Sequence, residues 1–308
     1  MQKIKLALVG IGKIARDQHL PVLGASDDFE LIACASRNAR VDGVNHYTTL
    51  AELIAGEPQL QAVSLCTPPG AREADARLAL AHGLHVLLEK PPAATLGAAA
   101  ALAAAARRSV LSASWHSRHA PALAPGRAWL AARKLRSVSI NWREDIRVWH
   151  PGQDWILEAG GMGVFDPGIN ALSILTALIS EPVIVGAAEF GVPEGRQAPL
   201  TAQLRLHTPS GLAIAVDLNF LEPGRPLWDI AFSSDDGVMT LHEGGARLSI
   251  DGVDAALASD PHYEYRSVYQ SFAASISAGQ SDCDLRPLAI VADAFTIARR
   301  AALAPFSF

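Results

Sequence analysis

The first 115 residues of the sequence repeat one pattern, in which a short, nearly continuous apolar run alternates with a stretch of helical character. The apolar runs are Ile4–Val9, Leu31–Ala35, Ala62–Cys66, Leu84–Leu88 and Val110–Ser114. Strands that are apolar on both faces indicate a parallel sheet with helices on both sides. The alanine-rich segment 93–108 fits one of these helices because alanine has the highest helix propensity and Thr95 can cap it. The sequence therefore predicts a doubly wound α/β domain over residues 1–118.

The order of helix-like and strand-like segments changes after Arg118. A helix-like stretch (Ala120–Arg133), a long strand pattern (Ser137–Trp149) and a helix (Pro167–Ile179) come first. Segments that alternate like antiparallel strands follow at Ile184–Phe190, Ala202–His207, Ala213–Phe220, Trp228–Phe232 and Val238–His242, and two helices close the chain at Ser267–Ala278 and Pro287–Ala302. Grouped strands with helices at the ends predict an α+β domain over residues 119–308 with a mostly antiparallel, open sheet. The C-terminal helix is a candidate to pack back on the first domain.

Composition excludes several classes of protein. Half of the 308 residues are hydrophobic and the mean hydropathy is +0.18, so the chain can bury a sizeable core. A net charge of −5 without a basic run argues against nucleic acid as a partner, and no apolar stretch is long enough to span a bilayer. The three cysteines, Cys34, Cys66 and Cys283, are too far apart for a Cys-x-x-Cys pair. Because the apolar run near the N-terminus is also too short for a signal peptide, we expect a cytoplasmic protein.

The first apolar run leads into Gly10-Ile11-Gly12-Lys13-Ile14-Ala15, a G-x-G-x-x-A pattern. In a dinucleotide site the first glycine makes the tight turn, and the second lets the backbone approach the pyrophosphate. The small third residue allows close packing, and the helix N-terminus attracts the anion. A tight strand-to-helix turn without a ligand is the alternative. The position of the G-x-G-x-x-A pattern within a strand-helix-strand unit favours a Rossmann domain that binds NAD or NADP.

The second strand ends at Ser36-Arg37, where a site that prefers NAD usually has Asp or Glu. A serine hydroxyl and a guanidinium can instead bind a 2′-phosphate, so we expect NADP to be favoured. The alternative is an arginine that is merely solvated.

Two groups of residues could carry out chemistry. Glu89-Lys90-Pro91-Pro92 follows a parallel strand, where ligands of open α/β sheets bind, so Lys90 is expected near the nicotinamide; a surface lysine is the alternative. The Lys90–Pro91 bond is a candidate for the cis form. Asp166 and Asn170 are four residues apart and share a helix face, and the glycines before them would let backbone approach a ligand. Asp166 could instead be only a helix N-cap.

Together these features resemble the family of glucose-fructose oxidoreductase and inositol dehydrogenase, and the resemblance spans the whole chain. Longer runs are similar to the bacterial branch that oxidises L-arabinose and D-galactose at carbon 1. These runs are residues 10–21, 115–118, 149–153 and 164–172. Many family members have His where this chain has Asn170, which leaves the proton to Asp166 or Lys90.

The resemblance implies oxidation of an aldopyranose of the L-arabinose, D-galactose or D-fucose type to its aldonolactone, with reduction of NADP or NAD. It implies that Lys90, Asp166 and Asn170 are catalytic and that Glu144, His150 and His116 bind sugar hydroxyls. Asp166 is the expected base and Lys90 its rival. The nucleotide would be held by Gly10, Gly12, Lys13, Ile14, Ser36, Arg37, Glu89 and Lys90.

Three tryptophans, Trp142, Trp149 and Trp155, flank Glu144 and His150, and their rings suit the apolar faces of sugars; the alternative is that most belong to the core. A metal site built from His116, His119 and His150 is a weaker alternative, since hydride transfer needs no metal. Two other functions stay open: a regulatory protein that binds nucleotide and sugar without turnover, and a polyol dehydrogenase, which Asn170 disfavours. The open sheet is a candidate homodimer surface.

Overall fold

The computed structural model describes residues 2–257 and 260–308, and the chain divides into two compact units. Unit 1 comprises Met1–His119 and Asp260–Leu285, and unit 2 comprises Ala120–Ser259 and Arg286–Phe308. The segment Asp260–Leu285 thus groups with the N-terminal residues, whereas the C-terminal residues belong to unit 2. No helix within the described residues is long and apolar enough to cross a membrane.

Unit 1 contains a six-stranded parallel sheet in the order β3-β2-β1-β4-β5-β6, which is the doubly wound Rossmann order. Its strands are β1 (Ile4–Val9), β2 (Phe29–Ala35), β3 (Asn45–Tyr47), β4 (Ala62–Leu65), β5 (His85–Glu89) and β6 (Leu111–Ser114). The predicted parallel sheet and five of its strands are confirmed. The sequence analysis missed β3, because three polar residues at a sheet edge show no apolar run.

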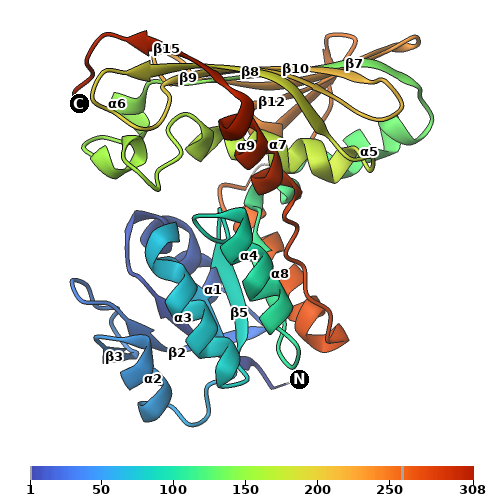
Figure 1. The fold of residues 1–308 in the computed structure, drawn as a ribbon. Helices are drawn as coiled ribbons and strands as arrows, with labels where there is room; N and C mark the ends of the chain where they lie inside the picture. Colours follow the sequence, from blue (N-terminus) through green and yellow to red (C-terminus); the bar gives the residue numbers. More distant parts are fainter. Residues whose placement is uncertain (1, 258–259) are drawn as a thin grey trace. The chain divides into compact units, whose positions relative to one another are not determined.

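Helices cover both faces of this sheet. They are α1 (Leu20–Gly24), α2 (Leu50–Gly56), α3 (Pro69–Ala81), α4 (Leu96–Ala105) and α8 (Tyr263–Ala278), with a π-helical turn η1 (Ala15–His19) before α1 and a 3₁₀ turn η2 (His116–His119) after β6. Figure 1 shows α3 and α4 side by side over β5. On the other face, Phe29 of β2 packs against Tyr269 and Phe272 of α8. Thr95 caps α4 as predicted and accepts the Ala98 N–H at 3.2 Å.

Unit 2 contains a nine-stranded sheet in the order β14-β13-β12-β11-β7-β10-β9-β8-β15. Among the described strands of this sheet, the β7–β10 and β8–β15 pairs are parallel and the others antiparallel, which confirms the predicted mostly antiparallel sheet. The strands are β7 (Leu135–Arg143), β8 (Ile184–Pro193), β9 (Thr201–His207), β10 (Ala213–Asn219), β11 (Leu227–Ser234), β12 (Gly237–His242), β13 (Arg247–Ile250), β14 (Val253–Asp254) and β15 (Arg299–Leu303).

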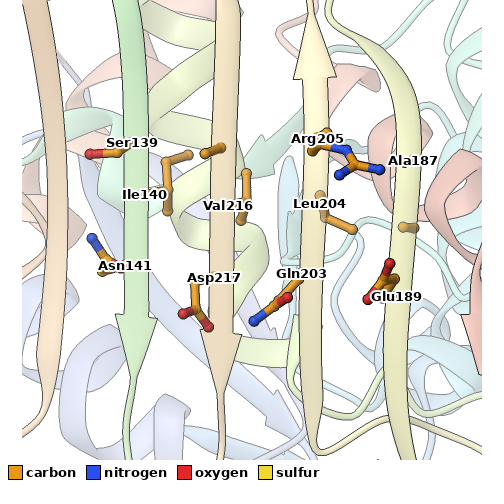
Figure 2. A pocket seen from close by; sticks show the side chains of 12 residues that line it. Ser139, Ile140, Asn141, Ala187, Glu189, Gln203, Leu204, Arg205, Val216 and Asp217 are labelled. Atoms are coloured by element: carbon orange, nitrogen blue, oxygen red, sulfur yellow. The ribbon is translucent and has the colours of Figure 1, made fainter. Parts of the chain in front are cut away.

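The two faces of the unit 2 sheet differ. Three helices, α5 (Leu123–Ala131), α7 (Phe165–Leu178) and α9 (Arg286–Ile297), lie along one face (Figure 1), and nearly all of α7 is buried. Shorter turns are α6 (Ile146–Trp149), η3 (Asp154–Leu157) and η4 (Glu243–Gly245). The opposite face presents alternate residues of β7 to β10, among them Asn141, Asp217, Gln203 and Glu189, around a hollow of about 370 Å³ (Figure 2).

Three predicted elements of unit 2 were wrong at their ends. The strand expected over Ser137–Trp149 stops at Arg143, because the Asp145 carboxylate caps α6 by accepting the Arg147 N–H. The helix expected over Ala120–Arg133 is confined to α5. The last helix ends at Ile297, and the next residues form β15 instead, since Arg299–Leu303 find backbone partners on β8. Pairing between distant segments overrides local propensity here.

Candidate functional site

The phosphate loop joins β1 to η1 in unit 1. Gly10 has φ +86°, and a Cβ there would lie 2.9 Å from the Thr67 backbone nitrogen, so the turn requires glycine. Ala15 is fully buried with Leu8, Ile11 and Cys34, which explains the small residue at that position. A Cβ on Gly12, in contrast, would meet no atom within 4 Å. The fold itself does not need glycine at position 12, whereas a ligand that approaches the backbone there would.

The end of β2 lies beside this loop, since the Gly10 N–H donates to the Ala35 carbonyl at 2.9 Å. Ser36 and Arg37 follow directly, and the Arg37 side chain is exposed. Lys13 pairs with Asp17 one turn later. The predicted nucleotide residues Gly10, Gly12, Ser36 and Arg37 therefore belong to one corner of unit 1, at the carboxyl ends of β1 and β2.

Lys90 follows β5 in a backbone segment that is held from two directions. The Arg72 guanidinium of α3, which is 2 % exposed, donates to the carbonyls of Glu89 and Pro91 on either side of Lys90. The Glu89 carboxylate accepts the Lys90 N–H at 2.9 Å and is itself buried. The Lys90–Pro91 peptide bond is cis, as expected.

The histidines that follow β6 lie in unit 1. His116 Nδ1 lies 2.5 Å from Glu264 Oε2 of α8, and its ring stacks on Tyr265. Burial lowers the pKa of His119 to about 4. Within the described residues, no group of three or more His, Cys, Asp or Glu side chains is arranged to hold a metal ion.

Asp166 and Asn170 lie one turn apart on α7 of unit 2. The N-cap of this helix is Val164, so Asp166 lies in the first turn rather than at the capping position. A carboxylate there interacts favourably with the helix dipole. The amide oxygen Oδ1 of Asn170 is buried and has no hydrogen-bond partner among the described residues. A buried unpaired acceptor of this kind is uncommon and is suited to a ligand.

Two of the glycines before α7 are required by backbone packing. A Cβ on Gly161 would lie 2.3 Å from the carbonyl oxygens of Trp155 and Ile156, and one on Gly163 would lie 2.1 Å from the Pro199 carbonyl. These glycines let one backbone segment pack against another. Gly160 differs from them, because a Cβ there would meet no atom within 4 Å, so the expected approach of a ligand stays a prediction for Gly160.

Three titratable side chains form a row in unit 2. His150 Nε2 lies 3.4 Å from Glu144 Oε1, and His150 Nδ1 lies 4.0 Å from Asp166 Oδ2. The first distance is long for a hydrogen bond and the second exceeds one. The exposed fraction of the side chain is 3 % for Glu144, 17 % for His150 and 12 % for Asp166, so the central histidine is the member most accessible to solvent. The row brings together three of the predicted sugar and catalytic residues.

Trp228 holds one end of this row. Its Nε1–H donates to Glu144 Oε2 at 2.8 Å, and its ring contacts both Trp142 and Trp149. Trp142 is buried, which confirms that part of the tryptophan cluster is core, whereas Trp149 and Trp155 are both 42 % exposed. The sequence analysis gave Trp228 no role, although its place in a predicted strand could have signalled it: it pairs across the sheet with Trp142.

Other residues around the site were also missed. Arg72 and His19 are both buried, and each bonds to Glu89. His19 comes four residues after Ala15 in the loop sequence, which is the only local signal for it. Arg72 carries no motif at all.

The unit 1 loop fits a dinucleotide. The open space at Gly12, the positive φ at Gly10 and the start of a helix directly after them are the features that a pyrophosphate requires. These features are those of a nicotinamide-dependent oxidoreductase.

Comparison with known proteins agrees with this class. Residues 4–114 match the GFO/IDH/MocA family, described as an oxidoreductase family with an NAD-binding Rossmann fold. The chain is 44 % identical over 306 residues to galactose 1-dehydrogenase of Pseudomonas fluorescens, covering 99 % of each chain. The chain belongs to this oxidoreductase family and is an enzyme.

Solved structures extend the comparison. A D-galactose-1-dehydrogenase from Rhizobium etli is 47 % identical, with a TM-score of 0.95 and coverage of 100 % of this chain and 99 % of the other. A 3-ketoreductase from Actinomadura kijaniata, solved with NADP and TDP-benzene, shares the fold at 19 % identity and a TM-score of 0.85, covering 98 % of this chain and 100 % of its own.

Proposed function

We propose that the enzyme oxidises an aldopyranose of the D-galactose, L-arabinose or D-fucose type at the anomeric carbon, giving the aldonolactone. The observation that carries the proposal is the row of Glu144, His150 and Asp166 in unit 2, next to the unpaired Asn170 oxygen. Such a row offers donors and acceptors to the several hydroxyls of one sugar ring. The names of the two relatives that match the whole chain support the choice of sugar.

Asp166 is the proposed base. The anomeric hydroxyl must lose its proton as the hydride leaves carbon 1, and a carboxylate within hydrogen-bond reach can accept it. The Lys90 ammonium stabilises the negative charge that develops on that oxygen, and the Asn170 amide orients the same hydroxyl. The nicotinamide, when bound, accepts the hydride. The C–H bond breaks, the exocyclic C–O bond becomes the lactone carbonyl, and the proton stays on Asp166 until solvent removes it.

Glu144 and His150 are the proposed ligands of the remaining ring hydroxyls, with His116 as a further contact. Glu144 can only accept, and Trp228 already occupies one of its oxygens, so it presents the other to a hydroxyl donor. A buried carboxylate left without its hydroxyl costs free energy, which makes the position of that hydroxyl a basis for selectivity.

The nucleotide is proposed to lie on Gly10, Gly12, Lys13 and Ile14, with the backbone at Glu89 and Lys90 near the nicotinamide. Ser36 and Arg37 would bind the 2′-phosphate of NADP, so we propose NADP as the favoured cofactor. The support is the absence of a carboxylate at the end of β2, where Ser36 and an exposed Arg37 stand instead.

A panel of sugars measured with each cofactor tests the proposal. D-Galactose, L-arabinose and D-fucose should each produce reduced nicotinamide, faster with NADP than with NAD. D-Glucose, which differs from galactose at one ring hydroxyl, should be a poor substrate, and myo-inositol should be inert. Turnover of inositol but of no aldose would overturn the proposal.

A homodimer through the outer face of the unit 2 sheet is also proposed. That face carries both signs of charge: Arg205 lies opposite Ala187 and Glu189 lies opposite Gln203 on neighbouring strands (Figure 2), and Arg143 pairs with Asp217. A face of this kind can meet a second copy of itself around a two-fold axis. Light scattering of wild-type protein and of Ala215→Arg tests the dimer, and a monomeric wild-type protein would refute it.

The enzyme is further proposed to act in the cytoplasm. The free cysteines Cys34, Cys66 and Cys283 agree with such a reducing compartment.

A further inference from the structure

A buried cluster lies directly behind the Lys90 segment of unit 1. Glu89 Oε1 accepts from His19 Nε2 at 3.0 Å and from the Tyr265 hydroxyl at 2.8 Å. His19 Nδ1 lies 2.8 Å from the Tyr269 hydroxyl, and the histidine side chain is fully buried. The cluster therefore joins η1 after the phosphate loop, the end of β5, and helix α8.

The Glu89 carboxylate receives three donors from three different elements. Two of them reach Oε1, and the Lys90 backbone N–H reaches Oε2. Only an ionised carboxylate can accept on both oxygens without presenting a hydrogen to one of these donors. The Lys90 N–H thus keeps its acceptor while Glu89 stays charged, in addition to the two Arg72 bonds to the neighbouring carbonyls.

A charged carboxylate in this place needs a compensating charge. Burial opposes its ionisation, because a buried charge without a partner is very unfavourable. His19 is the group in direct contact with the carboxylate that can carry this charge, while Arg72 bonds to the backbone carbonyls on either side of Lys90. An imidazolium donates from both ring nitrogens, which fits Glu89 on one side and the Tyr269 oxygen on the other.

We propose that the buried His19–Glu89 ion pair is the positioning device for Lys90, holding its backbone so that its ammonium is placed for catalysis. The proposal rests on the proposed function only in the role it gives to Lys90. Neither member of the pair acts on the substrate. They act through Lys90, by fixing the point from which its side chain extends.

The charge states agree with this geometry. Burial opposes both charges, yet the hydrogen bond and charge of His19 keep the pKa of Glu89 well below its usual range. The pKa of His19 is raised well above 6.5 despite burial. The neighbouring Cys66 and Tyr269 and the hydrogen bond to Glu89 all favour the charged form of His19. The titratable or charged groups that face the pair are Cys66, Arg72, His116, Tyr265 and Tyr269.

Glu89→Gln is the most informative variant. Glutamine keeps the size of the side chain but offers one acceptor oxygen in place of two, so either the Lys90 N–H or the His19 and Tyr265 donors lose their partner. Hydrogen exchange at the Lys90 amide should become at least about tenfold faster. The kcat for galactose should fall about 10- to 100-fold from misplacement of Lys90, while the Kd for NADP changes less than about threefold.

His19→Gln and His242→Gln form a matched pair of controls. His242 also lies 3.0 Å from a carboxylate, that of Asp229, but it is 26 % exposed and lies on the unit 2 sheet. His19→Gln should accelerate exchange at Lys90 and lower kcat, whereas His242→Gln should change neither. If His19→Gln does not fold, Tyr265→Phe removes a single donor to Glu89 and should produce a smaller change in the same direction.

A measurement on the wild-type protein keeps the test independent of any variant. The ¹⁵N shifts of the His19 ring should show an imidazolium at about pH 7.5, where an ordinary histidine is largely neutral. A neutral His19, or unchanged Lys90 exchange in a folded Glu89→Gln protein, would overturn the proposal. If the wild-type protein oxidises no aldose, the proposed function fails instead, and the exchange and NMR results still decide the role of the pair.

Discussion

Each unit places a histidine beside a glutamate, but the two pairs differ in how many of the surrounding polar atoms have hydrogen-bond partners. In unit 1, His19 and Glu89 are 3.0 Å apart, and Glu89 accepts from three donors. In unit 2, His150 and Glu144 are 3.4 Å apart, Asp166 is 4.0 Å from the same ring, and the nearby Asn170 oxygen has no partner among the described residues. A completed network fixes a backbone, whereas an incomplete one leaves atoms for a ligand. The comparison separates the residues proposed to position Lys90 from the residues proposed to contact the substrate.

The largest change in kcat should come from replacing the proposed base, Asp166. Asp166→Asn keeps the shape of the side chain but cannot take a proton, so kcat should fall by about 10²–10⁴ while NADP affinity stays nearly constant. The measurement is steady-state kinetics together with NADP titration.

Lys90→Met is the companion variant for that prediction. If Lys90 were the base, its replacement would be the more damaging of the two, and Asp166→Asn would retain most of its activity. A stable Asp166→Asn protein that binds NADP and turns over at a near-normal rate would show that the base is elsewhere.

Stability should depend most on the completed pair. His19→Ala leaves a buried carboxylate without its partner and should lower the free energy of unfolding by about 3–5 kcal/mol. His242→Ala removes a partly exposed pair and should cost about 1 kcal/mol or less. Urea unfolding of both variants measures the difference, and equal losses would contradict the importance given to burial.

The pH dependence of stability sharpens the same contrast. The lowered pKa of Glu89 adds stability above its unfolded value, near 4.5, and this is lost as the pH falls through the folded value. The raised pKa of His19 adds stability that is complete below its unfolded value, near 6.5, and is lost as the pH rises through the folded value. The difference in the free energy of unfolding between wild type and His19→Ala should therefore be largest between the two unfolded pKa values, near 4.5 and 6.5. It should become smaller at lower and at higher pH.

Changes at the Glu144–His150–Asp166 row in unit 2 should appear in the KM for the sugar. Glu144→Gln replaces an acceptor oxygen by a donor and should raise the KM for galactose about tenfold, because a charge-assisted hydrogen bond to a hydroxyl is lost. The ratio of kcat/KM for galactose to kcat/KM for glucose should also decrease. Trp228→Phe is the control, because it frees the second Glu144 oxygen without removing the charge. An unchanged preference in Glu144→Gln would remove Glu144 from sugar recognition.

The smallest expected effect concerns the cofactor. Arg37→Ala should raise the KM for NADP about tenfold and leave that for NAD unchanged, since only NADP has the phosphate that the guanidinium would bind. Equal effects on both cofactors would show that Arg37 is merely solvated.

The sequence predicted the parts of the molecule that local patterns encode. Apolar runs located five of the six parallel strands, and the four-residue spacing correctly placed Asp166 and Asn170 one turn apart on a helix. Local patterns failed where distant partners decide the structure. Arg299–Leu303 looks helical because it is rich in alanine and arginine, yet β8 recruits it as a strand. Gly161 and Gly163 have the appearance of a ligand loop, but they serve backbone packing.

The positioning network could not be found in the sequence for the same reason. His19 and Glu89 are 70 residues apart, and His19 and Tyr269 are 250 apart. None of these spacings has a period or motif. Only the folded sheet brings the end of β5, the turn after the phosphate loop and α8 to one point.

Transfer of deuterium from carbon 1 of the sugar tests the central claim most directly. The enzyme is given D-galactose labelled with deuterium at the anomeric carbon together with NADP, and both products are analysed by NMR and mass spectrometry. Oxidation at the anomeric carbon predicts reduced nicotinamide that carries one deuterium and a galactonolactone that carries none. Reduced nicotinamide without deuterium, together with a sugar product that retains the label, would show that another carbon is oxidised and would contradict the account.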